Sequence, residues 1–260
     1  KDYGIVFKYF IHEYSTTLSE RVSNIAPSAT LEITAKAKMM RAKGIDVVGL
    51  GGGEPDFDTP KHIKKALIKA LEEKFIYYTP SPGIPELREA IAEKLKKENG
   101  IDYSPDEIIV TPGAKQALFE AILALVNPKD EVLLPDPCWV SYEPMVQIAG
   151  GKAVFIPTYE EDEFALTSEE IEKKITKKTK ALIINSPCNP TGAMLTKKDL
   201  KAIADICLEH GIYVISDEIY EKITYGEKHV SIASFPEMKT VSYTHLRAHE
   251  TEADLVCRLL

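Results

Sequence analysis

Residues 181–192 read ALIINSPCNPTG, an apolar run that ends at an asparagine and leads into a turn rich in proline and glycine. The run is short and bounded by turn residues, as expected for a strand buried on both faces. Residues 212–220, IYVISDEIY, repeat the arrangement, with an apolar run that ends where acidic residues begin. Strands buried on both faces are typical of parallel sheets covered by helices, so these two stretches predict an α/β fold.

Strand-like and helical segments alternate from about residue 105 onward, which predicts a parallel-rich sheet with helices on both faces. The expected strands are residues 107–110, 131–134, 153–157, 181–185 and 212–216. The expected helices are residues 114–126, 142–149, 168–174 and a segment around 200–207. Ser168 is expected to cap the third of these helices. Earlier in the chain, residues 61–74 and 85–99 have apolar side chains at helical spacing and lysine-rich faces that we interpret as plain surface.

Composition narrows the class of protein. The chain has 260 residues and a formal net charge of -8, which argues against a nucleic-acid partner because such partners require a basic face. The four cysteines form no Cys-x-x-Cys pair, so we expect reduced thiols in a cytoplasmic protein, with no zinc site or other metal site. No apolar run approaches the roughly 20 residues of a membrane helix. No signal peptide is expected at the N-terminus.

Ligands of open α/β sheets bind beyond the carboxyl ends of the strands, so the residues that follow each expected strand are candidates. Residues 111–115, TPGAK, open a helix with small residues that let backbone N–H groups approach an anion. Each stretch alone has a simpler interpretation: TPGAK and NPTG (residues 189–192) as ordinary turns, and Asp217 as a polar strand end. Their occurrence together, each directly after an expected strand, predicts one ligand site at this edge of the sheet.

Several motifs elsewhere in the chain accompany these three. They are LGGGEPDF at 50–57, YTP at 78–80, GIPELR at 83–88, GAKQAL at 113–118, PCWVSY at 137–142, NPTG at 189–192 and DEIY at 217–220. Together they resemble the class I and II aminotransferases, a family of fold-type I pyridoxal-phosphate (PLP) enzymes, and are most similar to its prokaryotic aspartate aminotransferase branch. The resemblance runs from Leu18 to Lys239. It implies a fold-type I PLP-transferase with a large cofactor-binding domain and an incomplete small domain.

The resemblance implies a set of residues that hold pyridoxal 5'-phosphate. Asp217 would pair with the pyridine nitrogen, Asn189 and Tyr220 would hydrogen-bond the phenolate oxygen, and Trp139 would stack on the ring. The backbone of Gly113, Ala114 and Lys115 would hold the phosphate. PLP serves such enzymes as an electron sink for the carbanion formed at the substrate Cα.

The resemblance also implies substrates and a quaternary structure. Gly53 would lie against the substrate carboxylate, and Trp139 and Asn189 would line the same substrate site. Tyr78 would reach the phosphate of a neighbouring subunit, so a homodimer is expected. The reaction implied is transamination between an L-amino acid, with aspartate as the first candidate, and a 2-oxo acid.

The resemblance stops at Lys239. The family's next motif carries the lysine that forms a Schiff base with PLP, but no lysine follows Lys239 here, so no catalytic residue is assigned and this chain is expected to be inactive. We interpret residues 1–17 as a foreign or disordered extension and residues 240–260 as a tail foreign to the family. Between them, residues 18–65 would be an N-terminal arm with part of the small domain, and residues 66–239 an incomplete large PLP-binding domain.

Two other functions stay open. One is a PLP lyase or synthase, because a single fold hosts several reactions. The other is a non-catalytic PLP-binding protein, which the missing lysine favours. His245 and His249 have a spacing that could chelate a metal on a helix, but the sequence offers no third ligand beside them.

Overall fold

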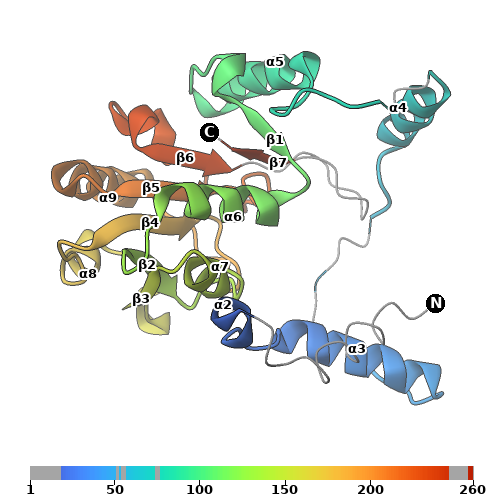
Figure 1. Cartoon of the computed structure of the whole chain (residues 1–260), viewed down its shortest axis with the longest axis horizontal. Coiled ribbons are helices and arrows are strands. Elements are labelled where there is room, and N and C mark those ends of the chain that lie inside the picture. The colour runs from blue at the N-terminus through green and yellow to red at the C-terminus, as the bar shows by residue number, and fades with distance from the viewer. Residues whose placement is uncertain (1–18, 51–52, 54–56, 74–76, 246–256, 260) are drawn as a thin grey trace. The chain divides into compact units, whose positions relative to one another are not determined.

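The structure, a computed structural model, describes residues 19–50, 53, 57–73, 77–245 and 257–259 (Figure 1). The chain divides into two compact units, Lys1–Glu54 and Pro55–Leu260. The domain boundary expected after residue 65 remains a prediction. The described helices of the first unit are α2 (Glu20–Ser23) and α3 (Ala29–Ala42). Among the described residues, no helix combines the length and the apolar character needed to cross a membrane.

A five-stranded sheet forms the centre of the second unit, and all of its strands run parallel. In spatial order the strands are β3 (Lys152–Pro157), β2 (Glu131–Asp136), β4 (Thr179–Asn185), β5 (Tyr213–Asp217) and β6 (Ser242–His245). The expected strands at 131–134, 153–157, 181–185 and 212–216 all lie in this sheet. The fifth strand, β6, begins beyond Lys239, so the sheet does not end where the resemblance ends.

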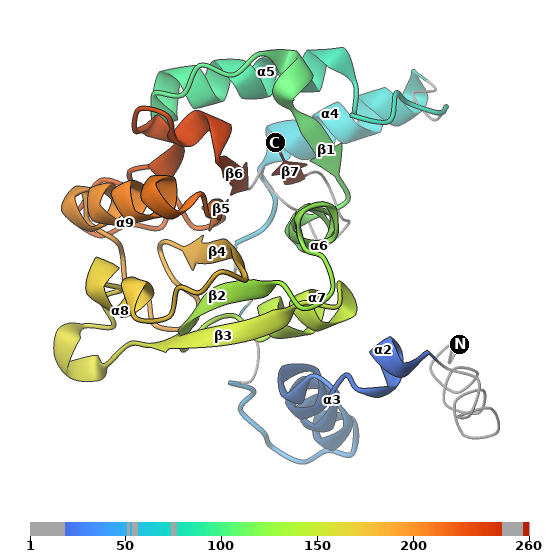
Figure 2. The ribbon, with the colours of Figure 1, turned by 60° about the vertical axis from the view of Figure 1, so that its left-hand side comes forward.

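Helices cover both faces of the sheet, as Figure 2 shows. They are α6 (Ala114–Leu125) and α7 (Tyr142–Ile148) on one face and α8 (Ser168–Glu172) and α9 (Lys197–His210) on the other. The two-residue period of the strands divides the core accordingly. In β4, Ile183 packs with the α6 and α7 side chains, while its neighbours Leu182 and Ile184 pack with those of α8 and α9.

Three details differ from the sequence-based expectations. The strand expected at 107–110 is β1 (Ile109–Thr111), preceded by a 3₁₀ turn, and it lies outside the five-stranded sheet. It pairs antiparallel with β7 (Cys257–Leu259), a pairing between distant segments that local sequence does not specify. The cap of α8 is Thr167, whose hydroxyl accepts a hydrogen bond from the Glu170 N–H, so the assignment of Ser168 was wrong by one residue.

The remaining helices of the second unit agree with the sequence pattern. They are α4 (Lys61–Glu72) and α5 (Pro85–Lys94), which continues as a π-helix over Leu95–Asn99. Helix α9 begins with a capping box in which Thr196 and Asp199 bond each other's backbone N–H groups, and it ends at Gly211 in a left-handed conformation. These local signals explain why the helical segments could be read from sequence.

Candidate functional site

Asp217 is the last residue of β5, and its side chain lies on the α6 and α7 face of the sheet. Ile215, two positions earlier, packs on that face, and the period of a strand places Asp217 on the same side. Its side chain is almost fully buried, with 4% exposed. One carboxylate oxygen accepts a hydrogen bond from the Tyr142 hydroxyl at 2.7 Å, and the other accepts one from the Ile219 N–H at 3.2 Å. The polar strand end predicted from sequence is therefore a buried carboxylate held from two sides.

Tyr142 is a site residue that the sequence-based assignment missed. It is the first residue of α7 and is 1% exposed. Burial, followed by the charge of Asp217, raises the pKa of the Tyr142 phenol well above its usual value of 10, so the hydroxyl stays protonated and donates to the carboxylate. The two residues are 75 positions apart, and the sequence around neither residue indicates that their side chains are in contact.

Hydrogen bonds connect the turn after β4 to the carboxyl end of β5. Asn185 pairs with Asp217 in the parallel register, and its side-chain amide donates to the Asp217 backbone carbonyl at 2.9 Å. The Asn185 side-chain oxygen accepts a hydrogen bond from the Asn189 N–H at 2.7 Å. Asn189, a residue predicted to bind the cofactor, is thus positioned beside Asp217 through Asn185.

The beginning of α6 lies close to this cluster. Gly113, the N-cap, has a φ of 85°, and no side chain caps the helix. The Lys115 ammonium lies over the indole of Trp139, 5.0 Å from the ring centroid. Trp139 in turn meets Tyr142 edge to face, with 5.3 Å between the ring centroids and an interplanar angle of 83°. A continuous set of contacts therefore leads from the start of α6 through Trp139 and Tyr142 to Asp217.

Three predicted site residues are less closely connected to this cluster. Tyr220 lies half-buried in the turn after β5, where its backbone carbonyl accepts a hydrogen bond from the Ile223 N–H at 2.8 Å. The Tyr78 side chain is fully exposed. Gly53 belongs to the first unit, and a Cβ built on it would meet no atom within 4 Å. The roles given to these three residues, like those of the other predicted site residues, remain predictions.

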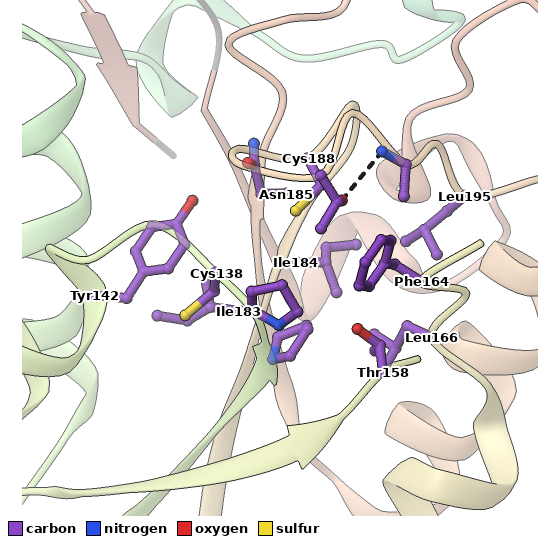
Figure 3. Close-up of a pocket in the computed structure, with 14 residues that line it drawn as sticks. Cys138, Tyr142, Thr158, Phe164, Leu166, Ile183, Ile184, Asn185, Cys188 and Leu195 are labelled. Atoms are coloured by element: carbon purple, nitrogen blue, oxygen red, sulfur yellow. Dashed lines mark hydrogen bonds between the residues drawn. The ribbon is translucent and has the colours of Figure 1, made fainter. Parts of the chain in front are cut away.

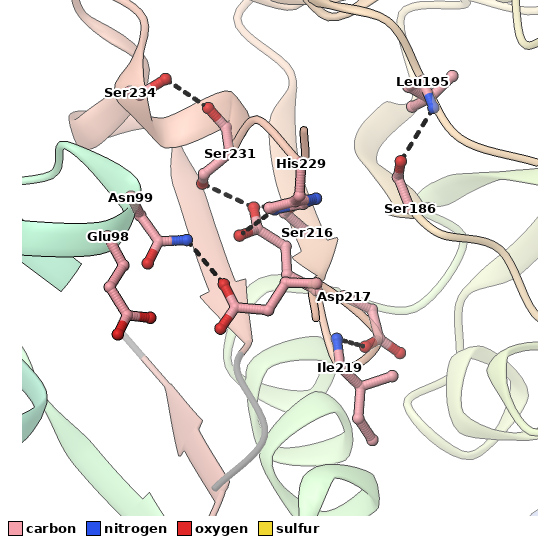
Figure 4. Close-up of polar contacts among 12 residues, drawn as sticks. Glu98, Asn99, Ser186, Leu195, Ser216, Asp217, Ile219, His229, Ser231 and Ser234 are labelled. Carbon is pink, nitrogen blue, oxygen red and sulfur yellow. Dashed lines mark hydrogen bonds and ion pairs between the residues drawn. The ribbon is translucent and has the colours of Figure 1, made fainter. Parts of the chain in front are cut away.

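Glu218, the residue after Asp217, bonds side chains at both ends of the segment that carries Tyr220; Figure 4 labels its partners Ser216, His229 and Ser231. Glu218 is 1% exposed and bonds the Ser216 hydroxyl, which the two-residue period of β5 places on the opposite side of the strand from Asp217. One of its oxygens accepts hydrogen bonds from Ser216 at 2.9 Å and Ser231 at 2.6 Å, and the other lies 3.0 Å from His229 Nε2. The carboxylate therefore joins the two ends of the segment between residues 218 and 231.

Glu218, Glu221 and His229 have donor atoms within 4.8 Å of one another, a spacing that a metal could use. Each already has protein partners, however. Glu221 bonds the Lys94 ammonium through one oxygen and the Asn99 amide, at 2.8 Å, through the other. The cluster is a satisfied network of hydrogen bonds and ion pairs.

A pocket opens at the carboxyl ends of β2 and β4, next to the polar cluster (Figure 3). Its lining is mostly apolar, and Tyr142, Asn185 and Cys188 contribute to it. Cys138 also lines it, and burial, with a smaller effect from Asp136, raises the pKa of this thiol to about 12. Cys138 is therefore protonated at neutral pH and is not an activated nucleophile.

The chain matches the family model described as aminotransferase class I and II over residues 45–255. It is 54% identical to the probable aspartate/prephenate aminotransferase of Aquifex aeolicus over 229 residues, and 51% identical to the aspartate aminotransferase of Bacillus subtilis over 221 residues. These alignments cover 87% and 85% of the chain but only 58% and 56% of the two relatives. Among solved structures, the aspartate aminotransferase of Thermus thermophilus with maleate superposes with a TM-score of 0.89 at 44% identity, covering 93% of this chain and 64% of that one.

Proposed function

The chain belongs to the class I and II aminotransferase family, and we propose that its whole protein transfers an amino group between aspartate and a 2-oxo acid. The family is PLP-dependent. The observation that carries the proposal is the buried Asp217 carboxylate, held by Tyr142 at the carboxyl end of β5 and flanked by Asn189 and Trp139.

The described residues fit the two ends of PLP. Each Asp217 oxygen accepts one of the hydrogen bonds described above, and a carboxylate has lone pairs for a further donor such as a protonated pyridine nitrogen. At the other end, α6 begins at Gly113 without a side-chain cap, and a helix N-terminus favours a phosphate. The buried carboxylate and the uncapped start of α6 therefore support PLP as the cofactor.

PLP, when bound, supplies the electron sink that stabilises negative charge at the substrate Cα. Asp217 would keep a proton on the pyridine nitrogen, because an adjacent negative charge favours the protonated form. Trp139 would offer its flat face to the ring. Asn189 and Tyr220 would donate hydrogen bonds to the ring oxygen, and the turn geometry that fixes Asn189 through Asn185 would limit its motion.

The names of the relatives support the choice of substrate. The B. subtilis relative is an aspartate aminotransferase, the A. aeolicus relative carries prephenate in its name, and the T. thermophilus structure was solved with maleate, a dicarboxylate. We therefore propose aspartate as donor, with 2-oxoglutarate or prephenate as acceptor. Gly53, where a side chain would have open space, is proposed to leave room for the substrate carboxylate.

We further propose that the whole protein is a cytoplasmic homodimer. The fully exposed Tyr78 is available to a second subunit, as the family resemblance implies. Cys138, Cys188 and Cys207 are free thiols, which is typical of a reducing compartment.

The test is a turnover assay of the full-length gene product with aspartate and each acceptor. Asp217→Asn, which keeps size but removes charge, is expected to lower kcat at least ~100-fold, an effect of the size that removing an electrostatic stabiliser has. Asp199→Asn, which alters a carboxylate of the α9 cap, is the matched control and should stay within about twofold. Release of ammonia or loss of a side chain without an acceptor would instead indicate a lyase.

The 260-residue chain provides a second test. No lysine follows Lys239, so we expect no turnover and no specific covalent bond to PLP. The chain would be incubated with PLP, reduced with borohydride and mapped by mass spectrometry. A stoichiometric adduct at one lysine, together with turnover, would contradict the expectation; scattered labelling of surface lysines would agree with it.

A further inference from the structure

Lys115 stands out among the lysines of the second unit because it faces the cluster described above and not a carboxylate. It is an exposed residue in the first turn of α6, and none of the ion pairs between described residues includes it. Its ammonium lies over Trp139 instead, at 5.0 Å from the ring centroid. This contact connects the residue at the proposed phosphate end of the site with the residue proposed to pack against the cofactor ring.

The Lys115–Trp139 contact opposes binding of a ligand's flat ring, whereas the same ammonium favours binding of its phosphate. An ammonium over an indole face is attracted by the ring, and at an exposed site the contact corresponds to about 2–5-fold in an equilibrium constant. A flat ligand that needs this face must displace the ammonium. A phosphate at the start of α6 gives the displaced ammonium a stronger partner, because charge-assisted bonds to phosphate exceed neutral ones.

From this geometry we infer that the Lys115 side chain makes the site selective for the phosphorylated form of a pyridine ligand. The ammonium covers Trp139 in the free protein and moves to the phosphate when a phosphorylated ligand enters. A ligand with the same ring but no phosphate displaces the ammonium without providing a new partner. The inference rests on the proposed function, since it takes the cofactor site as given, but it assigns to a side chain a role beyond that of the backbone N–H groups.

The experiment compares pyridoxine 5'-phosphate with pyridoxine. Both have the pyridine ring and neither has an aldehyde, so neither reacts covalently with lysines. Trp139 is the single tryptophan of the chain, and quenching of its fluorescence reports binding of either ligand. The variants are Lys115→Met, which keeps the apolar stem, and Lys115→Arg, which keeps the charge.

Lys180→Met is the matched control. Lys180 also lies over an aromatic ring, with its ammonium 5.1 Å from the Tyr213 centroid, but it is in the first part of β4, at the far end of that strand from Asn185. The control removes the same charge and the same kind of contact from the same chain, away from the proposed site.

We expect Lys115→Met to weaken pyridoxine 5'-phosphate binding at least 10-fold and to leave pyridoxine binding unchanged or up to about fivefold tighter. Lys115→Arg and Lys180→Met should keep the wild-type preference for the phosphorylated ligand. Equal weakening of both ligands by Lys115→Met, or an unchanged preference, would overturn the inference while leaving the cofactor site intact. If the wild-type chain bound neither ligand, the proposed cofactor site would fail and the inference with it.

Discussion

Replacing Tyr142 by phenylalanine removes one buried hydroxyl and leaves the aromatic ring against Trp139. The hydroxyl donates to Asp217 at 2.7 Å, and the two residues are 1% and 4% exposed, so water cannot readily replace the lost donor. A hydrogen bond to a charged group contributes about 1.5–3 kcal/mol. We therefore expect Tyr142→Phe to lower the free energy of unfolding by about 2 kcal/mol, which is roughly a 30-fold change in the unfolding equilibrium constant.

The measurement is a urea titration followed by far-ultraviolet circular dichroism, because tryptophan fluorescence would also report the altered surroundings of Trp139. Tyr103→Phe is the matched control. Tyr103 is a second buried tyrosine, and its hydroxyl approaches Ser242 and Thr244 without forming a hydrogen bond of good geometry. Removing that hydroxyl should change the free energy of unfolding by less than about 0.5 kcal/mol.

The pH dependence of the stability difference between wild type and Tyr142→Phe provides an additional test. Burial and the Asp217 charge raise the pKa of Tyr142 well above 10, so the phenol remains the donor at neutral and moderately alkaline pH. The difference between wild type and Tyr142→Phe should therefore hold from about pH 7 to about pH 9. If Tyr142→Phe lost no more stability than Tyr103→Phe at either pH, the hydrogen bond to Asp217 would not be a stabilising contact, and the reasoning would be wrong.

Three further predictions concern stability and use the same titration. Gly83→Ala should cost about 2–4 kcal/mol, because Gly83 has a φ of 99° and a Cβ there would lie 2.7 Å from the Val110 Cβ; a variant as stable as wild type would refute this. Burial raises the pKa of the Cys207 thiol from 9.0 to about 12, so between these pH values the unfolded chain loses the thiol proton while the folded chain keeps it. The free energy of unfolding of the wild type therefore falls in this range, and the difference in free energy of unfolding between wild type and Cys207→Ala should become smaller there. Glu218→Gln should cost about 1–3 kcal/mol, because an amide cannot accept all the hydrogen bonds that the carboxylate accepts; an unchanged urea midpoint would argue against the network.

Much of the central sheet and most of its helices could be predicted from sequence because their signals are local. The apolar run of β4, the capping box of α9 and the glycine that ends α9 each act within a few residues of the element they define. The partner of β1 could not be predicted in this way. It pairs with β7, which lies far along the chain, and neither short strand specifies the other.

In the candidate site, too, some residues could be predicted from local sequence and others could not. Asp217 ends β5 and Asn189 lies in the turn after β4, so a search for polar residues at strand ends selects both, and the parallel register brings those strand ends together. Tyr142 and the partners of Glu218 could not be found from the residue pattern alone. Their contacts join segments 75 and 13 positions apart, and a hydroxyl facing a distant carboxylate leaves no periodic signal in sequence.

The pairing of Asn185 with Asp217 in neighbouring strands has a consequence for protein engineering. The spacing of these two positions is fixed by the hydrogen bonds between β4 and β5, not by the turns that follow them. Libraries that randomise exposed positions of those turns, such as Pro190 and Tyr225, would vary the surface offered to ligands while leaving the two strand positions in register. Directed evolution of ligand selectivity could therefore vary these turns while keeping the sequence of the β4 and β5 strands unchanged.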